Sequence, residues 1–229
     1  MKTFTRFKND PELFDFIKKH LYVAAVCDIL DELGYRNQAM HHRLRPLLPD
    51  MHNCGFVGRA RTILWLETNE IMADDPYGME IEAIDSLREG DVAVHSTDER
   101  GTNAPWGELM STIAKQKKVA GCVCDSQVRD CVKIIEMNFP VYYTGIRPLD
   151  SKGRGIVTAY DIPIMCGDVM VNAGDLIYAD FDGIIVVPAA VEQQAIEMAI
   201  EKVSSENSSR KELLQGKSLR EVYDKYKVL

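Results

Sequence analysis

The sequence contains no long apolar run, and we therefore expect no membrane-spanning helix. No stretch of its 229 residues approaches the roughly 18 consecutive apolar residues that a membrane span requires. The first ten residues mix Lys2, Arg6 and Lys8 with single aromatics, where a signal peptide would have an apolar segment. We expect a cytoplasmic protein with no membrane partner.

Positive charge is also scarce. The chain has 27 Lys and Arg residues against 35 Asp and Glu residues, which gives a formal net charge of −8. Binding to nucleic acid depends on clustered Lys and Arg side chains that displace counterions from phosphates. No basic stripe with interleaved aromatics is present, so we expect no nucleic-acid partner.

Several common catalytic signatures are missing as well. The sequence has no Walker phosphate loop, no HExxH helix, no GxSxG turn and no GxGxxG loop. Its five histidines show no spacing typical of metal ligands, and its six cysteines include no CxxC pair. We expect the cysteines to be buried thiols.

The spacing of apolar residues predicts a single domain over residues 1–229 with a helical extension at each end. Apolar residues recur at helical intervals within residues 1–35 and again within 189–229, where Gly216 interrupts the pattern and Ser218 can cap a last helix. Residues 91–144 alternate between strand and helix patterns, whereas residues 155–188 contain short β-rich runs separated by turns. This combination predicts an α/β domain with layered sheets.

The first candidate site lies in residues 103–110. Pro105 favours the start of a helix, and Gly107 allows a ligand to approach the backbone closely. Amides in the first turn of a helix have no intrahelical acceptor and form a ready site for a carboxylate. The amides concerned are those of Gly107, Glu108, Leu109 and Met110. A helix start that binds no ligand fits the same pattern.

The second candidate site lies where the predicted strand over residues 119–124 runs into a helix predicted over 127–137. Ligands of open α/β sheets bind at this end of the strands. Arg129 offers a planar fork of donors for a carboxylate or enolate, and Asp130 offers hard oxygens for Mg²⁺ or Mn²⁺. Because neighbours on a helix do not face each other, we expect this pair to converge on a ligand without an ion pair between them. The alternative is a solvated charged pair beside a capping Asp125.

These two segments resemble the signature region of the RraA-like family. The resemblance covers roughly residues 23–229 and is carried by residues 106–109, 121–125 and 128–130, with later similar blocks such as 179–188. The family includes a ribonuclease regulator and the 4-hydroxy-4-methyl-2-oxoglutarate aldolases, which also decarboxylate oxaloacetate. The additional helices at both ends of this chain are similar to those of the aldolases.

The resemblance implies a swivelling β/β/α-type domain that assembles as a homotrimer or homohexamer. It also implies that the amides of residues 107–110 bind the carboxylate of a 2-oxo acid, that Arg129 binds the oxo group, and that Asp130 holds Mg²⁺ or Mn²⁺. The expected activity is that of a class II aldolase or oxaloacetate decarboxylase that forms pyruvate through an enolate. The alternative within the same family is a non-catalytic regulator that binds and inhibits an RNA-processing partner.

The helical pattern after Pro188 suggests a contact outside the domain. We expect its apolar face to pack on something beyond its own domain, such as a neighbouring subunit; this face comprises Val191, Ala195, Met198, Ala199 and Val203. In the aldolases of the family a C-terminal glutamate from the adjacent subunit reaches the active site, and Glu206 resembles it. A solvated glutamate near the end of a helix fits the pattern equally.

Overall fold

A computed structural model describes residues 6–72, 74–97 and 103–228 of the chain. Its strands are β1 (Arg45–Pro46), β2 (Phe56–Glu67), β3 (Asp91–Ser96), β4 (Gly121–Val128), β5 (Val141–Ile146), β6 (Gly155–Tyr160), β7 (Ile164–Cys166), β8 (Val169–Val171), β9 (Leu176–Asp180) and β10 (Gly183–Val187). Its helices are α1 (Asp10–His20), α2 (Val23–Glu32), α3 (Gly78–Asp85), α4 (Glu108–Gln116), α5 (Cys131–Glu136), α6 (Glu192–Leu214) and α7 (Leu219–Tyr226).

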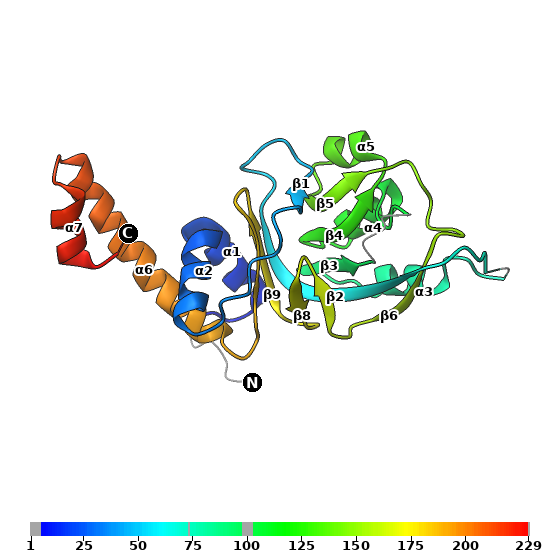
Figure 1. Cartoon of the computed structure of the whole chain (residues 1–229), viewed down its shortest axis with the longest axis horizontal. Coiled ribbons are helices and arrows are strands. Elements are labelled where there is room, and N and C mark those ends of the chain that lie inside the picture. Colours follow the sequence, from blue (N-terminus) through cyan, green and yellow to red (C-terminus); the bar gives the residue numbers. More distant parts are fainter. Residues whose placement is uncertain (1–5, 73, 98–102, 229) are drawn as a thin grey trace.

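An eight-stranded mixed sheet forms the centre of the described part of the molecule (Figure 1). Its strand order is β1-β5-β4-β3-β2-β9-β10, and β6 also pairs with β2. β2, β3, β4 and β5 run parallel to one another, whereas β1 pairs antiparallel with β5, and β6, β9 and β10 also pair antiparallel. This arrangement confirms both the βα alternation over residues 91–144 and the antiparallel character of residues 155–188.

Helices pack against this sheet in two groups (Figure 1). The group containing α3, α4 and α5 covers a core built around the fully buried Trp106 and Ile134. The group containing α1, α2 and α6 packs on β9 and β10 through Ile17, Leu30 and Ile196. The first group surrounds the candidate site, so the two extensions predicted at the ends of the chain are not needed to form it.

The helix predicted over residues 127–137 begins four residues later than expected. β4 continues to Val128 because, after a shift in register, Gln127 and Val128 pair with residues Gly145 and Ile146 of β5. The chain then turns at Asp130, and α5 starts at Cys131. The polar Gln127, predicted to begin the helix, therefore belongs to the strand.

Asp125 does not cap a helix, contrary to the alternative considered above. It lies within β4, where its carboxylate accepts hydrogen bonds from Arg43 Nε at 3.0 Å and Arg43 Nη2 at 2.9 Å. The backbone N–H of Gly167 donates to the same carboxylate at 2.7 Å. Asp125 thus ties β4 to the turn between β7 and β8.

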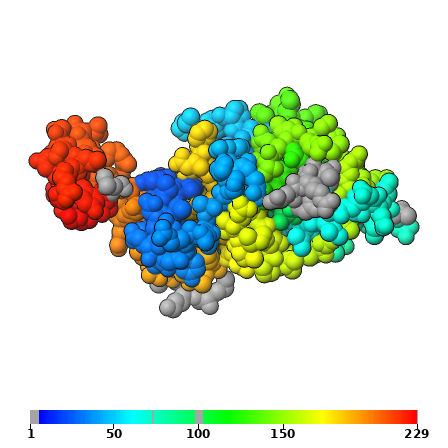
Figure 2. All heavy atoms as spheres, viewed as in Figure 1, coloured from blue at the N-terminus to red at the C-terminus, as the bar shows by residue number. Residues whose placement is uncertain are grey.

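The two C-terminal helices, α6 and α7, are present as predicted. The apolar face of α6, however, packs on its own chain and not on a neighbouring subunit. Ser218 caps α7 in a capping box with Glu221. Ala195 and Ala199 of α6 are fully buried in the same cluster as the residues of α1 and α2, so this apolar face is covered within the chain. The far end of α6 and α7 extend away from the sheet (Figures 1 and 2).

All six cysteines are free thiols, and the prediction that they are buried is confirmed for four of them. Cys54, Cys122, Cys124 and Cys166 are buried, and Cys27 and Cys131 are partly buried. Burial raises the pKa of the Cys124 thiol well above its ordinary value. Within the described residues, no helix is both long enough and apolar enough to cross a membrane.

Close backbone packing at Gly58 of β2 gives a test of the fold. A methyl group at this position would lie 2.3 Å from the Gly90 carbonyl oxygen and 2.9 Å from Val92 Cγ2. We predict that Gly58→Ala lowers the free energy of unfolding in urea by about 1–3 kcal/mol, as expected for overpacking.

Gly78→Ala is the matched control. Its new methyl group would meet only the carboxylate of Asp75, which is the end of a flexible side chain, and alanine favours the first turn of α3. Gly78→Ala should unfold at the urea concentration of the wild type or higher. Equal stability of Gly58→Ala and the wild type would contradict the packing described for β2.

Candidate active site

A cavity of about 760 Å³ opens beside α3, α4 and α5. Its polar lining residues include Tyr77, Glu80, Glu108, Arg129, Asp130, Asp150 and Ser151. Its apolar lining residues include Ile81, Ile84, Leu109, Met110, Ile113 and Val132. A concave site with an apolar wall and a few converging polar groups is typical of a small-molecule binding site.

The structure brings the two predicted site segments together in this cavity. Trp106 forms a parallel bridge with Val128, and the N–H of Arg129 donates to the Trp106 carbonyl at 3.0 Å. This backbone pairing places the start of α4 next to the turn that follows β4. Gly107, Glu108, Leu109, Met110, Arg129 and Asp130 all line the cavity as a result.

Asp130 occupies a backbone conformation that few residues adopt. Its φ is 57°, in the left-handed region, where a residue other than glycine costs about 1–2 kcal/mol. Its carboxylate Oδ2 accepts a hydrogen bond from the N–H of Glu108 at 3.2 Å. The side chain remains 46 % exposed, so the carboxylate both contacts the positive end of α4 and opens into the cavity.

Gly107 is required for space. Its φ of −149° is extended backbone that any residue can adopt. A methyl group at this position would lie 2.8 Å from Asp130 Oδ2 and 3.2 Å from Arg129 Cγ. We expected a ligand to approach this backbone, but the side chains of Arg129 and Asp130 already lie against it.

Arg129 lies between two carboxylates. Its Nη1 is 3.2 Å from Asp150 Oδ1, and its Nε is 3.7 Å from Asp130 Oδ2. The expectation that Arg129 and Asp130 would not pair is wrong, because these residues lie in a turn between β4 and α5 and not on a helix. The two carboxylates fix the guanidinium group, which is 37 % exposed, at the edge of the cavity.

Asp150 was not predicted as a site residue. Besides Arg129, its carboxylate accepts hydrogen bonds from the Tyr77 hydroxyl at 2.6 Å and from the N–H of Ser151 at 3.0 Å. The hydrogen bond to Asp150 raises the pKa of Tyr77. Asp150 occurs in a block that resembles the RraA-like family, but nothing in the local sequence indicates its contact with Arg129.

Glu80 is a second residue that sequence reasoning missed. Its side chain is only 6 % exposed, and its Oε2 accepts a hydrogen bond from the Ser151 hydroxyl at 3.0 Å. Burial raises the pKa of this carboxyl to about 7, with a further increase from the charge of Asp150, while Ser151 and Arg129 act in the opposite direction. In the sequence, Glu80 is one of several acidic residues in a short helix and carries no distinguishing signal.

The chemistry of Asp130 is compatible with a hard divalent cation. The described residues contain no group of three or more His, Cys, Asp or Glu side chains arranged to hold a metal. Among these residues the N–H of Glu108 donates a hydrogen bond to Oδ2 of Asp130, and none donates to its Oδ1. A single protein carboxylate suits Mg²⁺ or Mn²⁺, whose remaining positions are taken by water and substrate oxygens.

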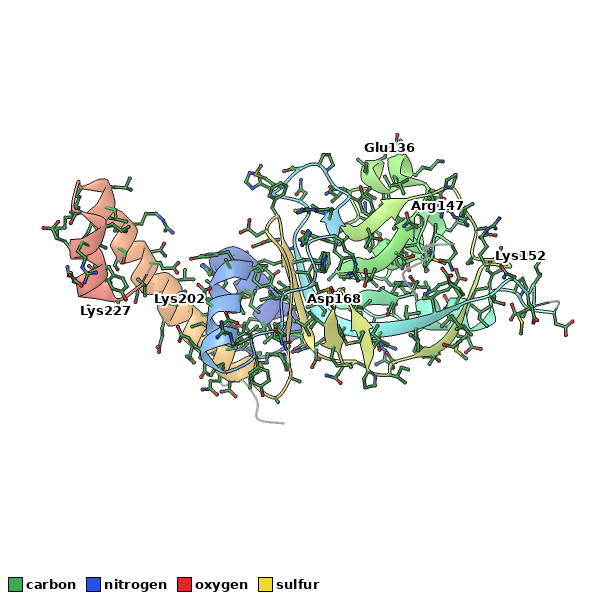
Figure 3. All side chains as sticks on the ribbon, in the orientation of Figure 1. Glu136, Arg147, Lys152, Asp168, Lys202 and Lys227 are labelled. Atoms are coloured by element: carbon green, nitrogen blue, oxygen red, sulfur yellow. The ribbon has the colours of Figure 1, made fainter. Side chains whose placement is uncertain are left out.

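Glu206 does not reach this cavity within one chain. It lies on α6, where its carboxylate is 3.7 Å from Lys202 Nζ. Figure 3 shows Lys202 on α6, far from Lys152, which is adjacent to the cavity residue Ser151. Only a second subunit could bring Glu206 to the site, and its role in trans stays a prediction.

The raised pKa of Glu80 predicts a pH-dependent stability. Between about pH 4.5 and pH 7 the folded state binds more protons than the unfolded state, so the free energy of unfolding falls as the pH rises through this window. Glu80→Gln has no ionisable group at this position, so it should not show this decrease in the free energy of unfolding. Relative to wild type, the variant should gain about 3 kcal/mol between pH 4 and pH 8, measured by urea unfolding.

Glu82→Gln, at an exposed position of the same helix, is the control and should follow the wild type at each pH. If the difference in stability between Glu80→Gln and the wild type stays constant from pH 4 to pH 8, the carboxyl is not buried as described.

Comparisons with known proteins identify the family and support the fold. The family model described as "RraA-like: Aldolase/RraA" matches residues 23–186. A protein of Halalkalibacterium halodurans named "Putative 4-hydroxy-4-methyl-2-oxoglutarate aldolase" is 30 % identical over 196 residues, which cover 85 % of this chain and 86 % of that protein.

Solved structures show the same fold. A structure described among novel cellulases from microbes of the gut ecosystem has a TM-score of 0.79 and 30 % identity over 90 % of this chain and 89 % of that chain. Streptomyces coelicolor RraAS2, described as an unusual member of the RNase ES inhibitor RraA protein family, has a TM-score of 0.75 and 28 % identity over 89 % of this chain and 98 % of its own. From the family match, the shared fold and the coverage of its relatives, we conclude that the chain belongs to the RraA-like family.

Proposed function

We propose that the protein is a divalent-metal-dependent lyase that cleaves a carbon–carbon bond of a 4-hydroxy-2-oxo acid or of an oxaloacetate-like acid and releases pyruvate. One observation carries the proposal: Arg129, Asp130 and the first-turn amides of α4 line a single cavity. A cation, a metal-ligating carboxylate and an anion-binding helix start are what a 2-oxo acid would require. The name of the Halalkalibacterium relative supports an aldolase activity.

The first turn of α4 would bind the substrate carboxylate. The N–H of Ser111 is the first to bond back to the turn, at the Gly107 carbonyl, so the amides before it lack an intrahelical acceptor. The N–H of Glu108 already donates to Asp130. We therefore assign the carboxylate to the amides of Leu109 and Met110, with Glu108 serving to hold Asp130.

Arg129 would bind the 2-oxo group. Cleavage leaves negative charge on this oxygen as an enolate, and a fixed guanidinium group stabilises that charge without having to reorganise. Asp150 and Asp130 hold the guanidinium from two sides. Asp130 would also hold Mg²⁺ or Mn²⁺, which, when bound, polarises the oxo group as a Lewis acid.

A non-catalytic regulator of RNA processing is the alternative, since relatives of that description share the fold. Such a protein would act through its outer surface. The cavity residues instead have their polar groups directed to one another and to the cavity, at the expense of a left-handed backbone at Asp130. Polar groups that converge on an apolar cavity are typical of a site for a small molecule, which favours an enzyme.

We also propose that the protein forms a homotrimer or homohexamer. The extended end of α6 and α7 would then contact a neighbouring subunit, and Glu206 would approach that subunit's cavity. Both statements rest on the family resemblance and on the position of α6.

Asp130→Asn tests the proposed function. The amide keeps the size of the side chain and its acceptor for the Glu108 N–H, but it removes the negative charge that a metal requires. We expect roughly a hundredfold or greater loss of Mg²⁺- or Mn²⁺-stimulated pyruvate release from oxaloacetate, together with loss of Mn²⁺ binding measured by electron paramagnetic resonance.

Glu136→Gln, an exposed carboxylate at the end of α5, is the control and should bind Mn²⁺ as the wild type does. Unchanged metal-stimulated activity in folded Asp130→Asn would refute the role of Asp130. A wild-type protein that binds no metal and releases no pyruvate would favour the regulator.

A further inference from the structure

Glu80 is a buried carboxyl group that the proposed function does not yet use. It lines the same cavity as Arg129 and Asp130, although only 6 % of it is exposed. Among the described residues its carboxyl group accepts one hydrogen bond, from the Ser151 hydroxyl, a neutral donor, at 3.0 Å. A buried acid with a single neutral partner in a binding cavity is a candidate for proton transfer.

Two other carboxylates of the cavity, those of Asp150 and Asp130, are committed to partners. Asp150 accepts hydrogen bonds from Tyr77 and Ser151 and pairs with Arg129, while Asp130 accepts from the N–H of Glu108. A carboxylate held by several donors is stabilised in its charged form and gives or takes a proton less readily. Glu80 differs from both of them in this respect.

We propose that the Glu80 carboxyl exchanges a proton with carbon 3 of the pyruvate unit. The inference rests on the proposed function and assigns to that site its proton donor. It would make Glu80 the catalytic residue for the step that follows cleavage, with Ser151 as its positioning residue.

Cleavage of the bond between carbons 3 and 4 leaves the electron pair on the pyruvate unit as an enolate. The O–H bond of protonated Glu80 then breaks, a C–H bond forms at carbon 3, and the enolate becomes pyruvate. The Glu80 carboxylate regains a proton from water, or from the 4-hydroxyl group by way of water when the substrate is an aldol. No redox change occurs.

The electrostatics of α3 and its neighbours support both forms of this group near neutral pH. Burial favours the neutral acid and Asp150 adds to this effect, whereas Ser151 and Arg129 favour the carboxylate. The balance places the pKa of Glu80 at about 7, where an acid can both give and accept a proton. The further titratable groups that line the cavity are Tyr77, Asp85, Glu108, Asp130, Cys131 and Lys133.

Exchange of the methyl protons of pyruvate in D₂O isolates this step from carbon–carbon cleavage. With Mg²⁺ present, wild-type protein should catalyse the exchange, followed by ¹H NMR, at a rate that rises with pH and levels off above a midpoint near 7. Glu80→Gln should exchange roughly a hundredfold more slowly and lose this pH dependence. Glu82→Gln, exposed on the same helix, should match the wild type.

Ser151→Ala separates a catalytic from a structural role. Loss of the Ser151 hydrogen bond, which lowers the pKa of Glu80, should move the midpoint to higher pH and leave the plateau rate within a few-fold of the wild type. A purely structural Glu80 would not shift a midpoint in this way. This variant also decides the matter if Glu80→Gln does not fold.

The outcomes distinguish the two proposals. Wild-type exchange together with Glu80→Gln exchange within threefold of it, at the same midpoint, would overturn the role of Glu80 and leave the lyase standing. An unmoved midpoint in Ser151→Ala would also overturn it. Absence of exchange in the wild type and in both variants would overturn the lyase itself, and the role of Glu80 with it.

Discussion

The contact between the start of α4 and the turn after β4 is the constraint on which the site depends. Two backbone segments separated by about twenty residues are joined by the bridge of Trp106 to Val128, and Gly107 leaves room for Asp130 to reach the first turn of the helix. Burial of Trp106, which is fully enclosed in the core, anchors this contact. Moving either segment would separate the first-turn amides of α4 from Arg129 and Asp130.

The charges around this contact form a chain in which each group orients the next. Asp150 accepts hydrogen bonds from the Tyr77 hydroxyl and the Ser151 N–H. Asp150 and Asp130 both form ion pairs with Arg129. Asp130 in turn accepts a hydrogen bond from the N–H of Glu108. Because these bonds are made before any ligand arrives, the guanidinium group and the carboxylate of Asp130 are already directed at the cavity. Such preorganisation lowers the cost of stabilising charge that develops during a reaction.

Local signals were sufficient for part of this site. The apolar run before Asp125 and the proline and glycine before Glu108 indicated a strand end and a helix start, and so the residues at both points were predicted. The continuation of β4 to Val128 was missed, because it depends on pairing with β5, which no local pattern reports. The ion pair of Arg129 with Asp130 was missed for the same reason, since it follows from the turn that this longer strand imposes.

Residues that enter the site from other parts of the chain were beyond sequence reasoning. Glu80 and Tyr77 come from the region of α3, and Asp150 from the loop after β5, and only the folded sheet places them near Arg129. For the apolar face of α6, the sequence revealed the residues but not the element that they pack against. Its periodicity was visible, but the partner that covers it is α2 of the same chain, which amphipathic spacing alone does not identify.

The central claim is that Asp130, Arg129 and the first turn of α4 form one site for a metal and a 2-oxo acid. A crystal structure of the protein soaked with Mn²⁺ and oxalate, a planar dianion that resembles the pyruvate enolate, tests it most directly. We predict an anomalous peak at bonding distance from Asp130, with oxalate oxygens on the amides of Leu109 and Met110 and on the guanidinium group of Arg129. Mn²⁺ bound elsewhere, or oxalate absent from the cavity at saturating concentration, would contradict the account.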